Sequence, residues 1–166
     1  MPVVITAERP DSPDATALVT ELEDHLAAHY PAESRHGLSV ERLIREGVAF
    51  FVLRADGEAA GCGGIKFVGT EFGELKRMYV RPRFRGAKFG ERLVEHLAAH
   101  ARAQGFSVLR LETGVHQTAA IRLYERLGFR RIPPFPPYRP DPLSQCFERV
   151  LAPDPVGAVA SNGPDG

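Results

Sequence analysis

Positive charge and glycine gather where one predicted helix begins. The stretch VRPRFRGAKFGERLVEHL, residues 80–97, places Arg83, Arg85 and Lys88 among glycines at the start of an apolar-periodic segment. A helix N-terminus presents unpaired backbone N–H groups and about half a positive charge. Glycines let an anion approach those groups closely, and the basic side chains add full charges. The pattern predicts an anion site, in the first instance for a phosphate; the alternative is a basic helix cap after a tight turn.

This segment is not one of the common nucleotide-binding loops. A Walker A loop needs G-x-x-x-x-G-K-[ST] and the dinucleotide fingerprint is G-x-G-x-x-G, and the segment matches neither. Met78, Tyr79 and Val80 run into the loop from the C-terminal end of a predicted strand. Ligands of open α/β sheets commonly bind at that end of a strand. These three residues are therefore candidates for ligand contact.

Two motifs, taken together and in order, resemble the GCN5-related N-acetyltransferases. The first lies in ELKRMYVRPRFRGAKFGERL and the second in LETGVHQTAAIRLYERLGFRRI. The family signatures are Arg/Gln-x-x-Gly-x-Gly/Ala before a helix, and Asn-x-x-Ala-x-x-x-Tyr-x-x-x-Gly-Phe. The resemblance covers residues 47–151. It implies an N-acetyltransferase with acetyl-CoA as co-substrate, which acts by direct attack of a primary amine in a ternary complex.

The resemblance also assigns residues to acetyl-CoA. In the family, backbone N–H groups of the first motif hold the pyrophosphate, and the preceding strand pairs with the pantetheine arm. Lys88 replaces an expected glycine, so its side chain either crowds a phosphate or pairs with one, and Gln117 replaces the usual asparagine. The implied cofactor-binding residues are Met78, Tyr79, Val80, Arg85, Gly86, Ala87, Lys88, Phe89, Gly90, Gln117 and Ala120.

Acetyl transfer to an amine needs a neutral amine, hydrogen-bond donors for the oxyanion and a proton for the departing thiolate. Tyr124 matches the family tyrosine near the acetyl-CoA sulfur and is the predicted acid; the alternative is a half-buried core tyrosine. Glu74 is the predicted base, because it lies on the strand entering the cofactor loop and shares strand parity with Met78 and Val80. The alternatives are a surface ion pair for Glu74, and Glu112 on the neighbouring strand as the base.

The acceptor is expected to enter from the side opposite acetyl-CoA. Arg35 and His36, in the loop after the first helix, are cationic and can hold a carboxylate. Phe135 and Tyr138, in the proline-rich segment PPFPPY, can face an apolar group. We expect a small amine or amino acid, contacted by Arg35, Glu112, Phe135 and Tyr138. A protein lysine or N-terminal amine, and a CoA-binding module without turnover, stay open as alternatives.

The predicted elements must bring these residues to one sheet. Their order is β-α-α-β-β-β-α-β-α-β-β, with Asp56-Gly57 as a hairpin turn and Gly128 after the last helix. Tight turns pair strands antiparallel, whereas the central strand–helix–strand unit needs a parallel pair. The fold class is therefore α/β (mixed α+β), a mixed and mostly antiparallel central sheet with helices on both faces. The resemblance adds a V-shaped splay at the cofactor site.

Composition narrows the function classes. Of 166 residues, 21 are Lys or Arg and 21 are Asp or Glu, so the net charge is zero. The chain therefore has no overall positive potential that would favour binding to nucleic acid or to an anionic membrane. No apolar run approaches the ~20 residues of a membrane helix. The two cysteines form no C-x-x-C, and the paired histidines form no H-E-x-x-H, so no metal is expected. We expect a cytoplasmic protein without a signal peptide, with a small-molecule amine as partner and no nucleic acid or membrane.

The length predicts one domain. We place it at residues 1–152 and expect residues 153–166, which lack periodicity, to form a flexible tail. Dimers are frequent among proteins of this type, so a homodimer through the final hairpin is a further expectation.

Overall fold

A computed structural model describes residues 2–36 and 38–153 of the chain. All but the first residue of the predicted tail lie outside these residues. The strands are β1 (Val3–Ala7), β2 (Ala49–Ala55), β3 (Glu58–Val68), β4 (Phe72–Val80), β5 (Val108–Gly114), β6 (Arg130–Ile132) and β7 (Ser144–Val150). The helices are α1 (Pro13–Ala27), α2 (Val40–Arg45), α3 (Phe89–Ala103) and α4 (Thr118–Arg126), with 3-10 turns η1 (Ala32–Ser34) and η2 (Pro82–Phe84).

The strands form one mixed sheet in the order β1-β2-β3-β4-β5-β7-β6. Every neighbouring pair is antiparallel except β4 and β5, which are parallel and joined through α3. The predicted order of elements and the fold class are confirmed. Local signals explain this agreement, because Asp56 and Gly57 make the β2–β3 turn with positive φ angles of 50° and 82°.

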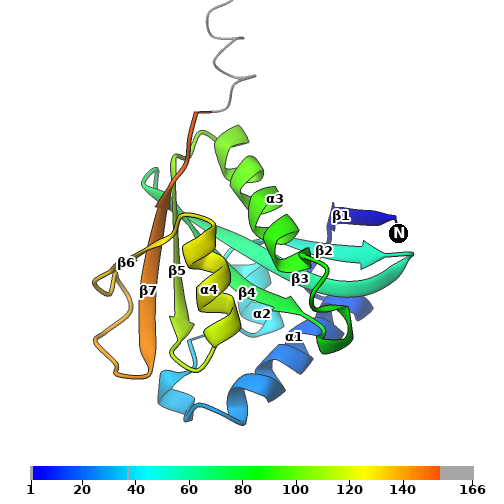
Figure 1. The fold of residues 1–166 in the computed structure, drawn as a ribbon, viewed down its shortest axis with the longest axis horizontal. Helices are drawn as coiled ribbons and strands as arrows, with labels where there is room; N and C mark the ends of the chain where they lie inside the picture. Colours follow the sequence, from blue (N-terminus) through cyan, green and yellow to red (C-terminus); the bar gives the residue numbers. More distant parts are fainter. Residues whose placement is uncertain (1, 37, 154–166) are drawn as a thin grey trace, which may run out of the picture.

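Helices cover both faces of the sheet (Figure 1). α3 packs its apolar stripe onto β3 and β4, where Leu97 meets Ile65 and Leu75 in one core cluster. α1 and α2 pack on the other face, in a cluster that includes Leu18 and Leu43. Serine caps begin both of these helices, Ser12 for α1 and Ser39 for α2.

The parallel strands β4 and β5 separate soon after they meet. Their pairing is limited to Gly73 with Leu109 and Glu74 with Arg110. β4 continues to Val80, and no other strand of the described residues pairs with that edge beyond Glu74. The wedge between the two strands opens toward their C-terminal ends, where α3 and α4 begin. This is the predicted splay.

A β-bulge in β4 changes which side chains share a face. Cys62 pairs with Tyr79 while Gly64 pairs with Lys76, so two residues of β4 lie opposite Gly63. The bulged residue Arg77 has a φ of 56°. Such a bulge reverses the alternation of side chains along the strand.

The consequence concerns Glu74. Leu75 and Met78 both pack on the α3 side, although residues three apart on a regular strand point to opposite faces. Glu74, next to Leu75, therefore points away from α3. The prediction that Glu74 shares a face with Met78 and Val80 is wrong, because the bulge reverses the alternation between them.

Within residues 2–36 and 38–153, no helix combines the length and apolarity that a bilayer crossing requires.

Candidate functional site

Two cavities meet in the wedge between β4 and β5. The larger cavity, of about 470 Å³, lies between the start of α3 and the start of α4. The smaller cavity, of about 130 Å³, lies between α1, the loop after it, β4 and β5. The residues that line both cavities are Leu22, Met78, Gln117, Ala120 and Tyr124.

The larger cavity collects the residues predicted to bind acetyl-CoA. Ala87 is the exception, because it is exposed and does not line the cavity. The lining includes Met78, Tyr79, Val80, Arg85, Gly86, Lys88, Phe89, Gly90, Gln117 and Ala120. Residues from β4, the loop after it, α3 and α4 are thus brought to one cavity, as the two motifs predict.

The backbone at the start of α3 explains why a glycine is expected there. Lys88 is the N-cap of α3 and has a left-handed conformation, with φ 63° and ψ 27°. This region costs an L-residue roughly 1–2 kcal/mol, whereas glycine adopts it freely. Gly86, two residues earlier, has a φ of 90°. Lys88 therefore keeps the turn that a glycine would make, and adds a charge at the cavity.

Two other residues of this turn have structural contacts that the sequence did not indicate. A Cβ at Gly90 would lie 2.9 Å from Leu123 Cδ2, so this glycine lets α3 and α4 approach each other closely. Arg85 donates from Nε to the carbonyl of Val80 at 3.1 Å. The guanidinium thus binds the last carbonyl of β4 at the mouth of the cavity.

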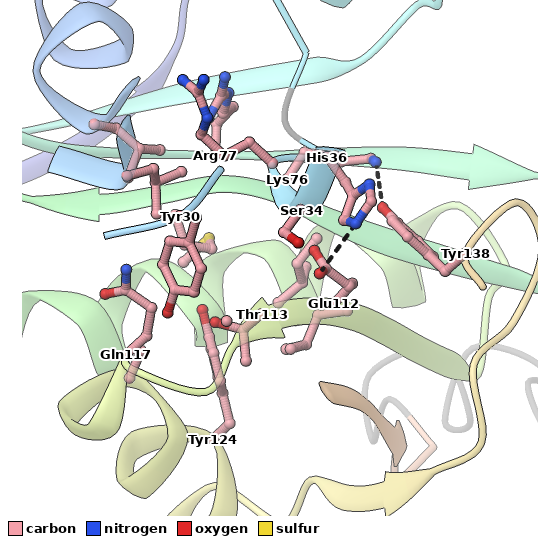
Figure 2. Close-up of a pocket in the computed structure, with 18 residues that line it drawn as sticks. Tyr30, Ser34, His36, Lys76, Arg77, Glu112, Thr113, Gln117, Tyr124 and Tyr138 are labelled. Carbon is pink, nitrogen blue, oxygen red and sulfur yellow. Dashed lines mark hydrogen bonds and ion pairs between the residues drawn. The ribbon is translucent and has the colours of Figure 1, made fainter. Parts of the chain in front are cut away.

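Tyr124 lies at the junction of the two cavities. Its side chain rises from α4 toward the space beside Tyr30 (Figure 2). It is 6% exposed and packs in the main core cluster next to Phe129. Burial raises the pKa of the Tyr124 phenol above its ordinary value, so the hydroxyl stays protonated at neutral pH. A buried core position and a hydroxyl at the site are therefore compatible.

Glu74 lies outside the two cavities and pairs with neighbouring side chains. Its side chain is 5% exposed, and the Tyr138 hydroxyl donates a hydrogen bond to its carboxylate. Lys76 Nζ lies 3.0 Å from the same carboxylate oxygen and donates to the Tyr138 hydroxyl at 2.8 Å. Glu74 is not among the residues that line either cavity. The structure places this predicted base in a buried network with Lys76 and Tyr138.

Glu112 lines the smaller cavity instead (Figure 2). Ser144 donates its hydroxyl to Glu112 Oε2 at 2.6 Å, and His36 Nε2 lies 4.0 Å from the same oxygen. Burial raises the pKa of the Glu112 carboxyl, against the opposing effects of Ser144, His36 and Lys76. A carboxyl with a raised pKa beside an open cavity is suited to accept a proton.

Of the residues predicted to contact the acceptor, all but Phe135 line the smaller cavity. Arg35 and Tyr138 line the smaller cavity, as does His36, whose ring meets Tyr138 edge-on. Phe135 does not line it, because this side chain is 4% exposed and packs with Phe72 in a separate core cluster. The expectation that Phe135 contacts the acceptor is not supported, since tertiary packing turns it inward.

Tyr30 is a residue that the sequence reasoning missed. Its hydroxyl accepts a hydrogen bond from the backbone N–H of His116 at 2.8 Å. A Cβ at Gly114 would lie 2.2 Å from the Tyr30 ring, so the ring fills the space that this glycine leaves. Tyr30 thereby supports the turn between β5 and α4, which carries Gln117. Leu22, Leu26 and Tyr30 are spaced four residues apart, so Tyr30 continues the apolar stripe of α1. This spacing could have indicated that Tyr30 points inward.

The described residues contain no group of three or more His, Cys, Asp or Glu side chains placed to hold a metal ion.

Comparison with known proteins identifies the family. The model of the acetyltransferase (GNAT) family matches residues 19–129. The chain belongs to the GNAT acetyltransferase family. The match includes the later part of α1, the wedge, the start of α3 and Tyr124. It ends before the proline-rich segment and β7, which add Tyr138 and Ser144 to the site.

Relatives of this GNAT protein cover nearly its whole length. The IAA acetyltransferase of Azospirillum brasilense is 44% identical over 151 residues, 90% of this chain and 98% of the relative. The uncharacterized N-acetyltransferase YsnE of Bacillus subtilis is 32% identical over 137 residues, 81% of this chain and 91% of the relative.

Solved structures share the GNAT fold. An acyl-CoA N-acyltransferase from Klebsiella pneumoniae is 38% identical, with a TM-score of 0.77 over 90% of this chain and 98% of its own. A GNAT acetyltransferase from Elizabethkingia anophelis, solved with acetyl-CoA bound, has a TM-score of 0.67 at 17% identity over 90% of this chain and 98% of its own. At that identity the second likeness concerns the fold alone.

Proposed function

We propose that this GNAT protein transfers the acetyl group of acetyl-CoA to the primary amine of a small molecule, by direct attack in a ternary complex. The larger cavity would hold acetyl-CoA and the smaller cavity the amine. The main support for the proposal is that the two cavities adjoin, since Tyr124 and Met78 line both of them. A thioester in one cavity and an amine in the other would meet there.

The larger cavity has the features that acetyl-CoA requires. Backbone N–H groups at the start of α3, with Lys88 and Arg85 beside them, suit a pyrophosphate. The edge of β4 between Leu75 and Val80 has no strand partner on the β5 side among the described residues, so its backbone groups can pair with an extended arm. The fit rests mainly on backbone groups, so Lys88 and Gln117 are compatible with it.

The smaller cavity supplies a base. A lysine-like amine is only about one part in 10³ neutral at pH 7, so the attack gains from a group that removes its proton. Glu112 faces this cavity and has a raised pKa, whereas Glu74 is held by Lys76 and Tyr138. We therefore assign the base to Glu112 in place of Glu74.

Tyr124 is assigned the acid. Its phenol is protonated at neutral pH and can give a proton, or a hydrogen bond, to the departing thiolate. The backbone N–H near Met78 would stabilise the oxyanion. In this assignment the ammonium gives its first proton to Glu112, and the neutral amine then attacks the thioester. The departing thiolate takes its proton from Tyr124, and the nitrogen of the new amide gives its second proton back to the Tyr124 phenolate. Glu112 alone ends protonated and passes its proton to water.

The size of the smaller cavity supports a small acceptor. At about 130 Å³ it lies below the roughly 300–1,000 Å³ of sites for drug-sized ligands. The name of the Azospirillum brasilense relative, IAA acetyltransferase, also points to a small molecule.

The test is release of free thiol from acetyl-CoA over a panel of small amines, amino acids and an N-terminal peptide. Turnover with small amines and not with the peptide is expected. If no acceptor releases thiol while CoA still raises the melting temperature, the protein is a CoA-binding module and the proposal fails.

A further inference from the structure

The smaller cavity is unusually basic for a chain of zero net charge. Four basic side chains line it, and Glu112 is the acidic one among its lining residues. The basic side chains are Arg35, His36, Lys76 and Arg77. The carboxylates that pair with these side chains decide how much of this positive charge is compensated.

Two of the cations share one carboxylate. Arg77, whose side chain is 4% exposed, donates from Nη2 to Glu23 Oε2 at 2.6 Å and from Nε to the carbonyl of Leu38. Arg35 donates from Nη1 to the other oxygen, Glu23 Oε1, at 3.2 Å. Lys76, by contrast, forms its own ion pair, with Nζ 3.0 Å from Glu74 Oε2. The Arg35–Arg77–Glu23 group therefore carries a net charge of one positive unit.

The uncompensated charge is on Arg35. Its Nε is buried and has no hydrogen-bond partner among the described residues. A buried donor without a partner is costly, and a guanidinium donor more so. With Nη1 bound to Glu23, the remaining edge of the guanidinium is formed by Nε and Nη2. That planar edge matches the two oxygens of a carboxylate.

We infer that the acceptor carries a carboxylate, which Arg35 binds through Nε and Nη2 in the smaller cavity. The inference rests on the proposed function and specifies its substrate class as a small amino acid-like molecule with both an amine and a carboxylate. The amine faces Glu112 and Tyr124, which line the same cavity, and the carboxylate satisfies the Arg35 donor. The single negative charge of a carboxylate equals the net charge of the Arg35 group.

The test compares each amino acid with its α-amide, which keeps the side chain and the amine but lacks the negative charge. The measurement is kcat/KM for thiol release from acetyl-CoA, expressed as the acid-to-amide ratio for one protein sample. Because both substrates meet the same sample, the fraction of folded protein cancels. The amide has the less basic amine, so a preference for the acid cannot arise from amine neutrality.

The wild-type protein should favour the acid of its best substrate at least about tenfold, the size expected of a hydrogen bond to a charged group. Arg35→Met should bring the ratio close to one, and Arg35→Lys should give an intermediate ratio, since an ammonium lacks the planar edge. The control is Arg9→Met, which removes an exposed arginine paired with Asp11 outside both cavities. It should leave the ratio unchanged.

An acid-to-amide ratio near one in the wild type, or a ratio that Arg35→Met does not change, overturns the inference and leaves the proposed function standing. If neither series releases thiol, the proposed function fails. The anion site is then judged by calorimetry, with the amino acids titrated into CoA-saturated wild type and Arg35→Met. Binding that is lost in the variant would support the site, and equal or absent binding would overturn it.

Discussion

At the scale of single residues, the site depends on groups whose surroundings set their chemistry. Glu74 and Glu112 lie on adjacent strands and have different neighbours, and their side chains are 5% and 12% exposed. Glu74 is paired with Lys76 and accepts from Tyr138, so its charge is compensated. Glu112 accepts a hydrogen bond from Ser144 and has His36 at 4.0 Å, but it has no lysine or arginine ion pair among the described residues. Burial raises its pKa. Environment, and not residue type, separates the proposed base Glu112 from the buried, ion-paired Glu74.

The pair gives a direct prediction. Glu112→Gln should lower kcat/KM by roughly 10²–10⁴-fold, because general base catalysis is lost. Glu74→Gln should act mainly on stability, since it leaves Lys76 as a buried charge without its partner, at a cost of about 3–5 kcal/mol. Steady-state kinetics and urea unfolding of both variants measure this. A larger kinetic loss in Glu74→Gln than in Glu112→Gln would reverse the assignment.

The pH dependence follows from the same residue. A raised pKa means that Glu112 is protonated, and inactive as a base, up to a higher pH than an ordinary glutamate. Activity should therefore fall as the pH drops through this raised pKa. A pH profile of kcat/KM should show this acid limb, and the limb should disappear in Glu112→Gln. An identical acid limb in the variant would assign it to another group.

Lys88 gives a prediction on stability. Lys88→Gly relieves a left-handed backbone at the start of α3 and should stabilise the protein by up to about 1 kcal/mol, or ~2–4 °C in Tm. Lys88→Ala removes the same charge but keeps the strain, so it serves as the matched control and should not gain stability. Thermal unfolding without cofactor is the measurement. Equal Tm values for the two variants would mean that the backbone is not strained.

At the scale of elements, the turn between β5 and α4 is held in place by α1's C-terminal loop. Gly114 and Tyr30 fit against each other, and the Tyr30 hydroxyl holds the backbone N–H of His116. Gly114→Ala should therefore destabilise strongly in the wild type and much less in a Tyr30→Ala background, where the ring is gone. A double-mutant cycle by urea unfolding measures the coupling. Additive effects would show that the contact does not matter.

The elements also show what sequence can and cannot predict. The Asp56-Gly57 turn and the order of the elements follow from local sequence signals, and these predictions are confirmed. The bulge at Arg77 is different, because an arginine is not a residue that signals a left-handed backbone. Its position depends on the pairing of β4 with β3. That single inserted residue turned the predicted base to the wrong face.

The site itself shows the same limit. The motif residues other than Ala87 line the larger cavity as predicted, because they lie within the turn and helix starts that form it. Phe135 and Tyr138 are three residues apart in one loop, yet one fills a core cluster and the other lines the smaller cavity. Only the packing of Phe135 against Phe72, distant in sequence, decides between them.

At the scale of the whole molecule, one wedge in the sheet brings two cavities together. The α1–α2 loop and the proline-rich loop meet beside the smaller one, where Ser34 donates to Asp141 at 2.7 Å. The larger one lies between α3 and α4. The central claim is that these cavities hold two substrates that react beside Tyr124.

The most direct measurement of that claim is the effect of Tyr124→Phe on kcat and on the Kd for CoA. Phenylalanine keeps the buried ring and removes the hydroxyl, so the core should remain intact. The account predicts a kcat reduced by about 10²-fold or more with an unchanged Kd for CoA. An unchanged kcat, or losses of equal size in kcat and in CoA affinity, would contradict it.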